Sequence, residues 1–113
     1  MPKILIADDS LVVRHALRAQ LVAKGAEVVA TGGFVEASAV DVTDLDAALL
    51  DLDLGDGDGL TLYHALRAKR PTLPIAFFSS EDDTPLGNDA RMITTVFSKD
   101  RLDDAVAWAL SRA

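Results

Sequence analysis

The stretch ALLDLDLGDGDGL, residues 48–60, places four aspartates and three glycines directly after a short apolar run. Four carboxylates so close together repel one another, so their crowding needs a physical reason. Three reasons compete from the residues alone: a calcium-binding loop, a nucleophilic carboxylate, or a solvated turn. The segments on either side of the stretch decide between them.

Short apolar runs alternate with amphipathic segments along the rest of the chain, and most of these runs are apolar throughout. This pattern is typical of parallel strands that are covered on both faces. The runs predict five strands, at residues 3–7, 27–30, 47–50, 75–78 and 94–97. Helices are predicted between them, so the fold class is α/β, with a doubly wound parallel sheet flanked by helices.

The helix signals come from caps, helix breakers and periodicity. Ser10 is a predicted N-cap for a first helix that Gly25 ends. Pro85 and Gly87 predict that the fourth helix is short or distorted. The other predicted helices cover residues 34–42, which is a weak pattern, and residues 60–69, and a last helix at the end of the chain has Leu102, Val106 and Leu110 four residues apart on one face.

The composition limits the class of protein. The chain has 113 residues, half of them apolar, which is enough for one domain with one core. It contains no cysteine, which fits a reducing compartment, and we expect a cytoplasmic location. Its net charge of −7 argues against binding to nucleic acid, and no apolar run is long enough to cross a membrane.

Polar side chains follow four of the five predicted strands. Asp8 and Asp9 follow the first strand, Asp51 the third and Ser79 the fourth, and Lys99 lies just beyond the fifth. In open α/β sheets, ligands bind beyond the carboxyl ends of the strands, and neighbouring strands lie roughly 4.8 Å apart. We therefore expect these five side chains to meet in one crevice.

The chemistry of these side chains is specific. Three neighbouring carboxylates raise one another's pKa unless a cation lies among them, and a small set of oxygen ligands with room for water favours Mg²⁺. A carboxylate can attack phosphorus and form an aspartyl phosphate. Magnesium and a lysine ammonium then offset charge on the transferring oxygens, and a serine hydroxyl can hydrogen-bond one of them.

Four segments together resemble a known family: ILIADDS at residues 4–10, LLDLDLGDGDG at 49–59, PIAFFSS at 74–80 and FSKD at 97–100. Over essentially its whole length, the chain resembles the receiver domain of two-component response regulators. The resemblance implies one receiver domain over residues 1–113, with a flavodoxin-like fold and strand order 2-1-3-4-5. It implies a module that catalyses only its own phosphorylation and dephosphorylation, and so not an enzyme in the usual sense.

The resemblance also implies roles for the acidic residues. Asp51 would be the phosphoacceptor. Mg²⁺ would be bound by Asp8, Asp9, Asp51 and the backbone carbonyl of Asp53. Gly59 matches a family glycine after the third strand.

Further roles concern the phosphoryl group and its exchange with other proteins. Ser79 would be the switch hydroxyl and Lys99 would pair with the phosphoryl group, while Asp53 and Glu81 would tune the lifetime of the phosphoaspartate. The donor would be a histidine kinase or a histidine phosphotransfer protein. The output would be a downstream protein or a fused domain.

Several residues depart from the family pattern. Asp100 replaces a proline that usually follows the lysine, and it is a predicted N-cap of the last helix. Gly55 replaces another frequent proline, which predicts a more mobile loop. Val96 stands where the family often has a rotating aromatic residue, and Phe97 should face the other side of the sheet. These departures predict ordinary phosphorylation with altered output coupling.

The residues argue against two rival readings of the opening stretch. If Gly59 is aligned with the glycine of a calcium loop, Leu54 and Ala65 fall at ligand positions one and twelve, and neither has a ligand side chain. Asp56 and Asp58 are then expected to build the turn and cap the next helix. A haloacid-dehalogenase-like phosphatase would match Asp51-Leu52-Asp53, but would leave the acids after the first strand unexplained.

Two other functions remain open from the sequence. The domain can be an interaction module that does not need phosphate, or a phosphate sink that drains a kinase without any output. The intact set of strand-end residues argues against the first, and the irregular region around Pro85 argues mildly for it.

Overall fold

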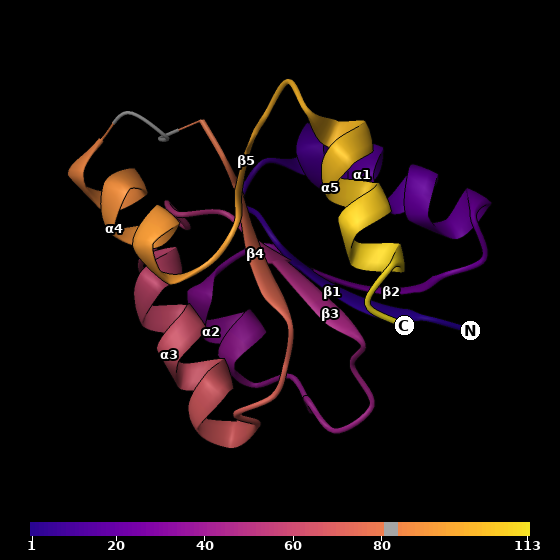
Figure 1. Cartoon of the computed structure of the whole chain (residues 1–113), viewed down its shortest axis with the longest axis horizontal. Coiled ribbons are helices and arrows are strands. Elements are labelled where there is room, and N and C mark those ends of the chain that lie inside the picture. Colours follow the sequence, from indigo (N-terminus) through magenta and orange to yellow (C-terminus); the bar gives the residue numbers. More distant parts are fainter. Residues whose placement is uncertain (81–83) are drawn as a thin grey trace.

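The structure, a computed structural model, describes residues 1–80 and 84–113 and is a doubly wound α/β sheet (Figure 1). The strands pair in parallel in the order β2-β1-β3-β4-β5, which confirms the expected topology. The strands are β1 (Lys3–Ala7), β2 (Glu27–Thr31), β3 (Ala47–Leu50), β4 (Ile75–Ser79) and β5 (Val96–Ser98). The helices are α1 (Leu11–Ala23), α2 (Phe34–Ser38), α3 (Gly59–Lys69), α4 (Pro85–Ile93) and α5 (Leu102–Leu110).

Two layers of helices cover the sheet, with α1 and α5 on one face and α2, α3 and α4 on the other (Figure 1). Successive side chains of a strand point to opposite faces, so each central strand contributes to both cores. In β1, Ile4 and Ile6 join the core under α1 and α5, whereas Leu5 and Ala7 join the core on the opposite face. Burial on both faces explains why these strands are apolar throughout.

The predicted ends of α1 are confirmed. The Ser10 hydroxyl accepts a hydrogen bond from the Val13 amide at 3.3 Å, which satisfies one free donor of the first turn. Gly25 follows the helix at a φ of +90°, a conformation that glycine adopts with little strain.

The helix α4 is short, as expected, but its proline and glycine do not interrupt it. Pro85 occupies the first position of the helix, where a missing amide donor costs nothing. The Thr84 hydroxyl caps the helix by accepting a hydrogen bond from the Gly87 amide at 3.1 Å. Gly87 itself is buried. The residues at which the expected irregularity begins, 81–83, lie outside the described part of the chain.

Some element ends differ from the sequence prediction. The helix α2 stops at Ser38, before Val42, which is instead a buried residue of the following loop. The strand β5 begins at Val96 because Thr94 serves as the C-cap of α4: its amide donates to the Ala90 carbonyl at 3.0 Å.

The prediction that Asp100 caps the last helix is wrong. A turn in which the Arg101 amide donates to the Ser98 carbonyl at 2.9 Å delays the start of α5, so Arg101 holds the N-cap position without a side-chain cap. The Asp100 carboxylate instead accepts a hydrogen bond from the Ser98 hydroxyl. This contact keeps a compact turn after β5 where the family usually has proline.

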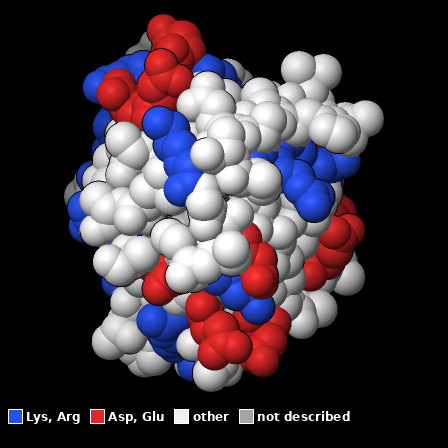
Figure 2. Space-filling view, turned by 90° about the vertical axis from the view of Figure 1, so that its right-hand side faces the viewer, with Lys and Arg blue, Asp and Glu red and all other residues white. Residues whose placement is uncertain are grey.

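The surface carries charges of both signs. Figure 2 shows acidic and basic side chains interspersed over one face, with uncharged surface between them. Among the described residues, none of the helices is both long and apolar enough to span a bilayer.

Candidate functional site

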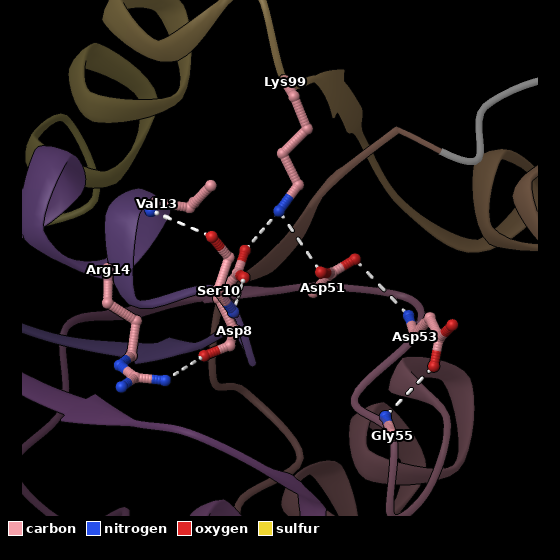
Figure 3. A network of polar contacts seen from close by, with 8 residues as sticks. All are labelled: Asp8, Ser10, Val13, Arg14, Asp51, Asp53, Gly55 and Lys99. Carbon is pink, nitrogen blue, oxygen red and sulfur yellow. Dashed lines mark hydrogen bonds and ion pairs between the residues drawn. The ribbon is translucent and has the colours of Figure 1, made fainter.

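The carboxyl ends of four strands carry the strand-end residues, and Figure 3 shows three of them, Asp8, Asp51 and Lys99, close together. Asp8 follows β1, Asp51 follows β3, Ser79 ends β4, and Lys99 follows β5. Their positions follow from the strand order, because β1, β3, β4 and β5 are neighbours in the sheet. Asp8, Asp51 and Ser79 are buried, which is unusual for polar side chains outside a functional site.

The Lys99 ammonium lies between two of the carboxylates. In Figure 3 its side chain reaches from the end of β5 toward both Asp8 and Asp51. Its Nζ donates to Asp51 Oδ2 at 3.2 Å and makes an ion pair with Asp8 Oδ2. The ammonium also lies 5.2 Å from the centroid of the Phe78 ring, close enough for a cation–π contact. The site therefore holds one positive charge in direct contact with two buried negative charges.

The pKa of Asp51 is raised above its ordinary value. Burial is the main cause, because it disfavours the charged form, and the neighbouring Asp8 carboxylate raises the pKa further. Lys99 opposes both effects through its charge and its hydrogen bond, and a hydrogen bond from the Asp53 amide acts in the same direction. A positive charge next to Asp51 therefore favours the ionised carboxylate, and Lys99 supplies one such charge.

Three carboxylates could share one metal ion. Asp8, Asp9 and Asp51 each offer an oxygen atom, and these atoms lie within 4.8 Å of one another. Asp9 is exposed to solvent, whereas the other two are buried, so the cluster opens outward on one side. A set of three carboxylate oxygens with access to water fits a hard divalent cation.

Asp53 lies beside the cluster on the exposed side of the loop. Its amide donates to Asp51 Oδ1 at 3.4 Å, and its own Oδ1 accepts from the Gly55 amide at 3.0 Å (Figure 3). The carboxylate of Asp53 therefore stabilises the turn around Gly55, whose φ is +79°. Glu81, the other residue expected to tune the phosphoaspartate, lies outside the described residues.

The two remaining aspartates of the opening stretch are both capping residues, but they cap different helices. Asp58 is the N-cap of α3 and accepts a hydrogen bond from the Thr61 amide at 2.8 Å, as predicted. Asp56 instead binds the first amides of α2, a helix that precedes it in the chain. The sequence argument expected both to serve the next helix, and it missed this long-range contact.

Arg14 of α1 also contacts the cluster, a contact that the sequence analysis did not predict. Its Nη1 donates to the backbone carbonyl of Asp8 at 2.9 Å, so the guanidinium supports the backbone of a cluster residue (Figure 3). A Cβ atom on Gly32 would lie 2.9 Å from that nitrogen. Gly32 is the one feature of the sequence that indicates how closely the Arg14 guanidinium approaches the backbone.

Comparison with known proteins agrees with the fold and identifies the family. A family model described as the response regulator receiver domain matches residues 4–100. The virulence transcriptional regulatory protein PhoP of Salmonella choleraesuis (strain SC-B67) is 34% identical over 83 residues, which are 73% of this chain and 37% of that protein. The chain spans well under half the length of the curated relatives it matches.

Solved structures match over nearly the whole chain. The receiver domain of the Francisella response regulator 1452 superposes with a TM-score of 0.85 at 20% identity, covering 99% of this chain and 96% of that one. The response regulator protein TrrA from Thermotoga maritima, solved in complex with Mg²⁺–BeF, has a TM-score of 0.82 at 20% identity, with 100% of both chains covered.

The five-stranded doubly wound sheet, with an acidic cluster and a lysine at its carboxyl edge, agrees with the matched family, whose receiver domains are signalling modules. The chain belongs to the response regulator receiver domain family of two-component systems.

Proposed function

We propose that Asp51 is the residue that accepts the phosphoryl group, with Mg²⁺ bound by Asp8, Asp9, Asp51 and the backbone carbonyl of Asp53. The observation that carries this proposal is the arrangement of the site: three carboxylates within 4.8 Å of one another, with the Lys99 ammonium 3.2 Å from Asp51. Such a site can bind a divalent cation and neutralise a phosphoryl group next to a buried carboxylate.

The transfer step makes Asp51 a nucleophile. One Asp51 carboxylate oxygen forms a bond to phosphorus, while the bond from phosphorus to the donor's imidazole nitrogen breaks and its electron pair remains on that nitrogen. Lys99 offsets negative charge on the transferring oxygens. Bound Mg²⁺ supplies further positive charge at the same place. The donor class is a histidine kinase or a histidine phosphotransfer protein.

Ser79 and Lys99 are proposed to hold the phosphoryl group after transfer. Ser79 is fully buried at the end of β4, and in the register of the sheet it lies opposite Ser98, the residue before Lys99. A hydroxyl and an ammonium on adjacent strands can therefore bind different oxygens of one phosphoryl group. Asp53 and Glu81 are proposed to tune the lifetime of the product. When water attacks the phosphorus, the bond from phosphorus to the Asp51 oxygen breaks, inorganic phosphate leaves and the carboxylate is regenerated, so the domain dephosphorylates itself.

The added charge is proposed to shift an equilibrium between two conformations, which then controls a downstream protein or a fused domain. Couplings of this kind are typically about 1–3 kcal/mol, so both conformations should coexist without phosphate. Val96 packs toward the face covered by α2, α3 and α4, while Phe97 packs against Trp108 of α5, with ring centroids 6.4 Å apart. The usual aromatic switch is thus replaced by a small aliphatic side chain, which supports an altered route to the output.

The intact mass of the protein tests the proposed function. After incubation with Mg²⁺ and a small-molecule phosphodonor, we expect the wild type to gain one phosphoryl group, because the donor supplies phosphorus directly to Asp51. The Asp51→Asn variant should gain none, since an amide is a poor nucleophile. Chelation of the cation with EDTA should prevent the gain in the wild type.

The decay of the adduct then distinguishes a durable signal from a phosphate sink. Absence of the adduct in the folded wild type, while the same donor modifies another receiver domain, would contradict the proposal. That result would favour a docking module that does not use phosphate.

A further inference from the structure

Asp56 joins the loop after β3 to the start of α2. Its Oδ1 accepts a hydrogen bond from the Phe34 amide at 2.6 Å, and its Oδ2 accepts one from the Val35 amide at 3.1 Å. Both carboxylate oxygens are thus used by two successive amides that α2 leaves without partners in its first turn. These amides hold the pKa of Asp56 below its ordinary value, the Phe34 amide being the larger cause, as expected for donors that favour the charged form.

Two glycines allow this approach, one on each side. A Cβ atom on Gly33, the N-cap residue of α2, would lie 2.8 Å from Asp56 Oδ1. A Cβ atom on Gly57 would lie 2.7 Å from the Cγ atom of Phe34. The segments at Gly33–Phe34 and Asp56–Gly57 therefore fit together only because neither glycine carries a side chain. We refer to the contact between these four residues as the α2 clasp.

The clasp is attached to a closed turn that begins at Asp53, two residues after Asp51. Within the turn, the Leu54 amide donates to the Gly57 carbonyl at 3.0 Å, and Asp53 and Asp58 form an isolated antiparallel bridge. The tip of the turn lies near the carboxylate cluster: a Cβ atom on Gly55 would be 3.8 Å from Asp9 Oδ2. The turn is therefore fixed to the rest of the protein at the sheet and, through Asp56, at α2.

We propose that Asp56 is a positioning residue for the phosphorylation site: by binding the first amides of α2, it holds the turn that presents the Asp53 backbone and the Asp51 carboxylate to the cation. This inference rests on the proposed function for what is bound at the site. It goes beyond that function by assigning a role to a residue that touches neither the cation nor the phosphoryl group.

The affinity for Mg²⁺, measured by isothermal titration calorimetry, tests this role. Partners that orient metal ligands typically change affinity by about 10–100-fold when removed, and because the clasp is exposed we expect Asp56→Ala to raise the dissociation constant about three- to tenfold. Asp56→Asn keeps one acceptor oxygen, so its dissociation constant for Mg²⁺ should lie between those of Asp56→Ala and the wild type. The hydrogen exchange of the Phe34 and Val35 amides should accelerate in the same order.

Asp58→Ala is the matched control. It removes the same charge from the same turn and also removes a helix cap, but it leaves the clasp intact. We expect it to change the Mg²⁺ affinity by less than about twofold. Equal weakening by Asp56→Ala and Asp58→Ala would overturn the proposal, since loss of charge alone would then explain the effect.

Gly57→Ala tests the clasp without any change of charge. The added methyl group must displace the base of the Phe34 ring, so we expect it to weaken Mg²⁺ binding in the same direction as Asp56→Ala. If Gly57→Ala folds and binds Mg²⁺ as tightly as the wild type, the clasp does not position the site.

Failure of this inference and failure of the proposed function give different results. If the wild type gains a phosphoryl group and Asp56→Ala matches it in Mg²⁺ affinity and initial rate of phosphorylation, the positioning role fails and the function stands. If the wild type gains none but Asp56→Ala selectively weakens Mg²⁺ binding, the proposed transfer fails while the positioning of the cation site stands.

Discussion

A Lys99→Met variant is expected to bind Mg²⁺ more tightly than the wild type and yet to accept a phosphoryl group far more slowly. The two effects have opposite signs because, in the proposed function, Lys99 competes with the cation before transfer and assists the reaction during transfer. In the structure its ammonium is paired with both Asp8 and Asp51, two of the three carboxylates that are proposed to bind Mg²⁺.

The tighter binding follows from the loss of one positive charge at the site. Without Lys99, the cation no longer meets the repulsion of a neighbouring ammonium, and two carboxylates lose their protein counter-charge. We expect the Mg²⁺ dissociation constant to fall about three- to tenfold, a modest figure because solvent reaches the site and screens the charges. Calorimetric titration of the folded variant measures this change.

The variant should also lose stability in the absence of divalent cations. Removing one partner from a fully buried ion pair typically costs about 3–5 kcal/mol, but the Lys99 side chain is 22% exposed, so we expect a loss of about 2 kcal/mol. Millimolar Mg²⁺ should restore much of it, because the cation takes over the role of counter-charge. Thermal unfolding with and without Mg²⁺ tests this compensation.

The slower transfer follows from the loss of a preorganised donor. Removing one group that stabilises charge in a transition state typically slows a reaction about 10²–10³-fold, and we expect a loss of this size in the rate of phosphorylation at saturating Mg²⁺. Lys24→Met, which removes an exposed lysine at the end of α1, is the matched control and should leave both quantities unchanged. If Lys99→Met binds Mg²⁺ more weakly than the wild type, Lys99 and the cation do not compete for the carboxylates.

Most of the fold and of the strand-end cluster could be predicted from the sequence because their signals are local. A buried strand in a parallel sheet is a continuous apolar run, and the polar residue that ends such a run marks the edge where ligands bind. Asp8, Asp51 and Lys99 are each identified by their place directly or almost directly after a run. Their mutual contacts then follow from the strand order.

The contacts that could not be predicted join segments far apart in the chain. Asp56 binds amides 21 and 22 residues before it, and nothing local distinguishes it from Asp58, which caps the helix that follows. Asp100 has the chemistry of an N-cap, but a tight turn from Ser98 starts the helix one residue later. Helix and strand ends depend on such competition between neighbouring hydrogen bonds, which composition and periodicity do not reveal.

Among the glycines for which the structure gives the surroundings of an added Cβ atom, Gly59 is the one whose replacement by alanine is expected to be the most destabilising. Gly59 is the first residue of α3, and it is buried. A Cβ atom there would lie 2.2 Å from the Asp51 carbonyl oxygen and 2.9 Å from the Cα atom of Leu52. Both neighbours are backbone atoms, so no side-chain rotation can relieve the contact, and the loop after β3 must move.

Overpacking of a well-packed site typically costs about 1–3 kcal/mol and occasionally more, and we expect at least about 3 kcal/mol here because the overlap is with backbone. Small domains have only about 5–15 kcal/mol of stability, so this is a large fraction of the total. Urea unfolding followed by the fluorescence of Trp108, the one tryptophan of the chain, measures the loss.

Gly25→Ala is the control that measures the cost of losing glycine's conformational freedom without a steric clash. No atom lies within 4 Å of a Cβ at Gly25, so its cost comes only from a φ of +90° and should be about 1–2 kcal/mol. The same methyl group at Gly59 should cost more and should also reduce phosphorylation under conditions where the variant is folded, because the displaced atoms belong to the backbone of Asp51, the proposed phosphoacceptor, and of Leu52. If Gly59→Ala is no less stable than Gly25→Ala, the loop after β3 can move without penalty. The positioning role of Asp56 assumes that this turn is rigid, and that assumption would then be wrong.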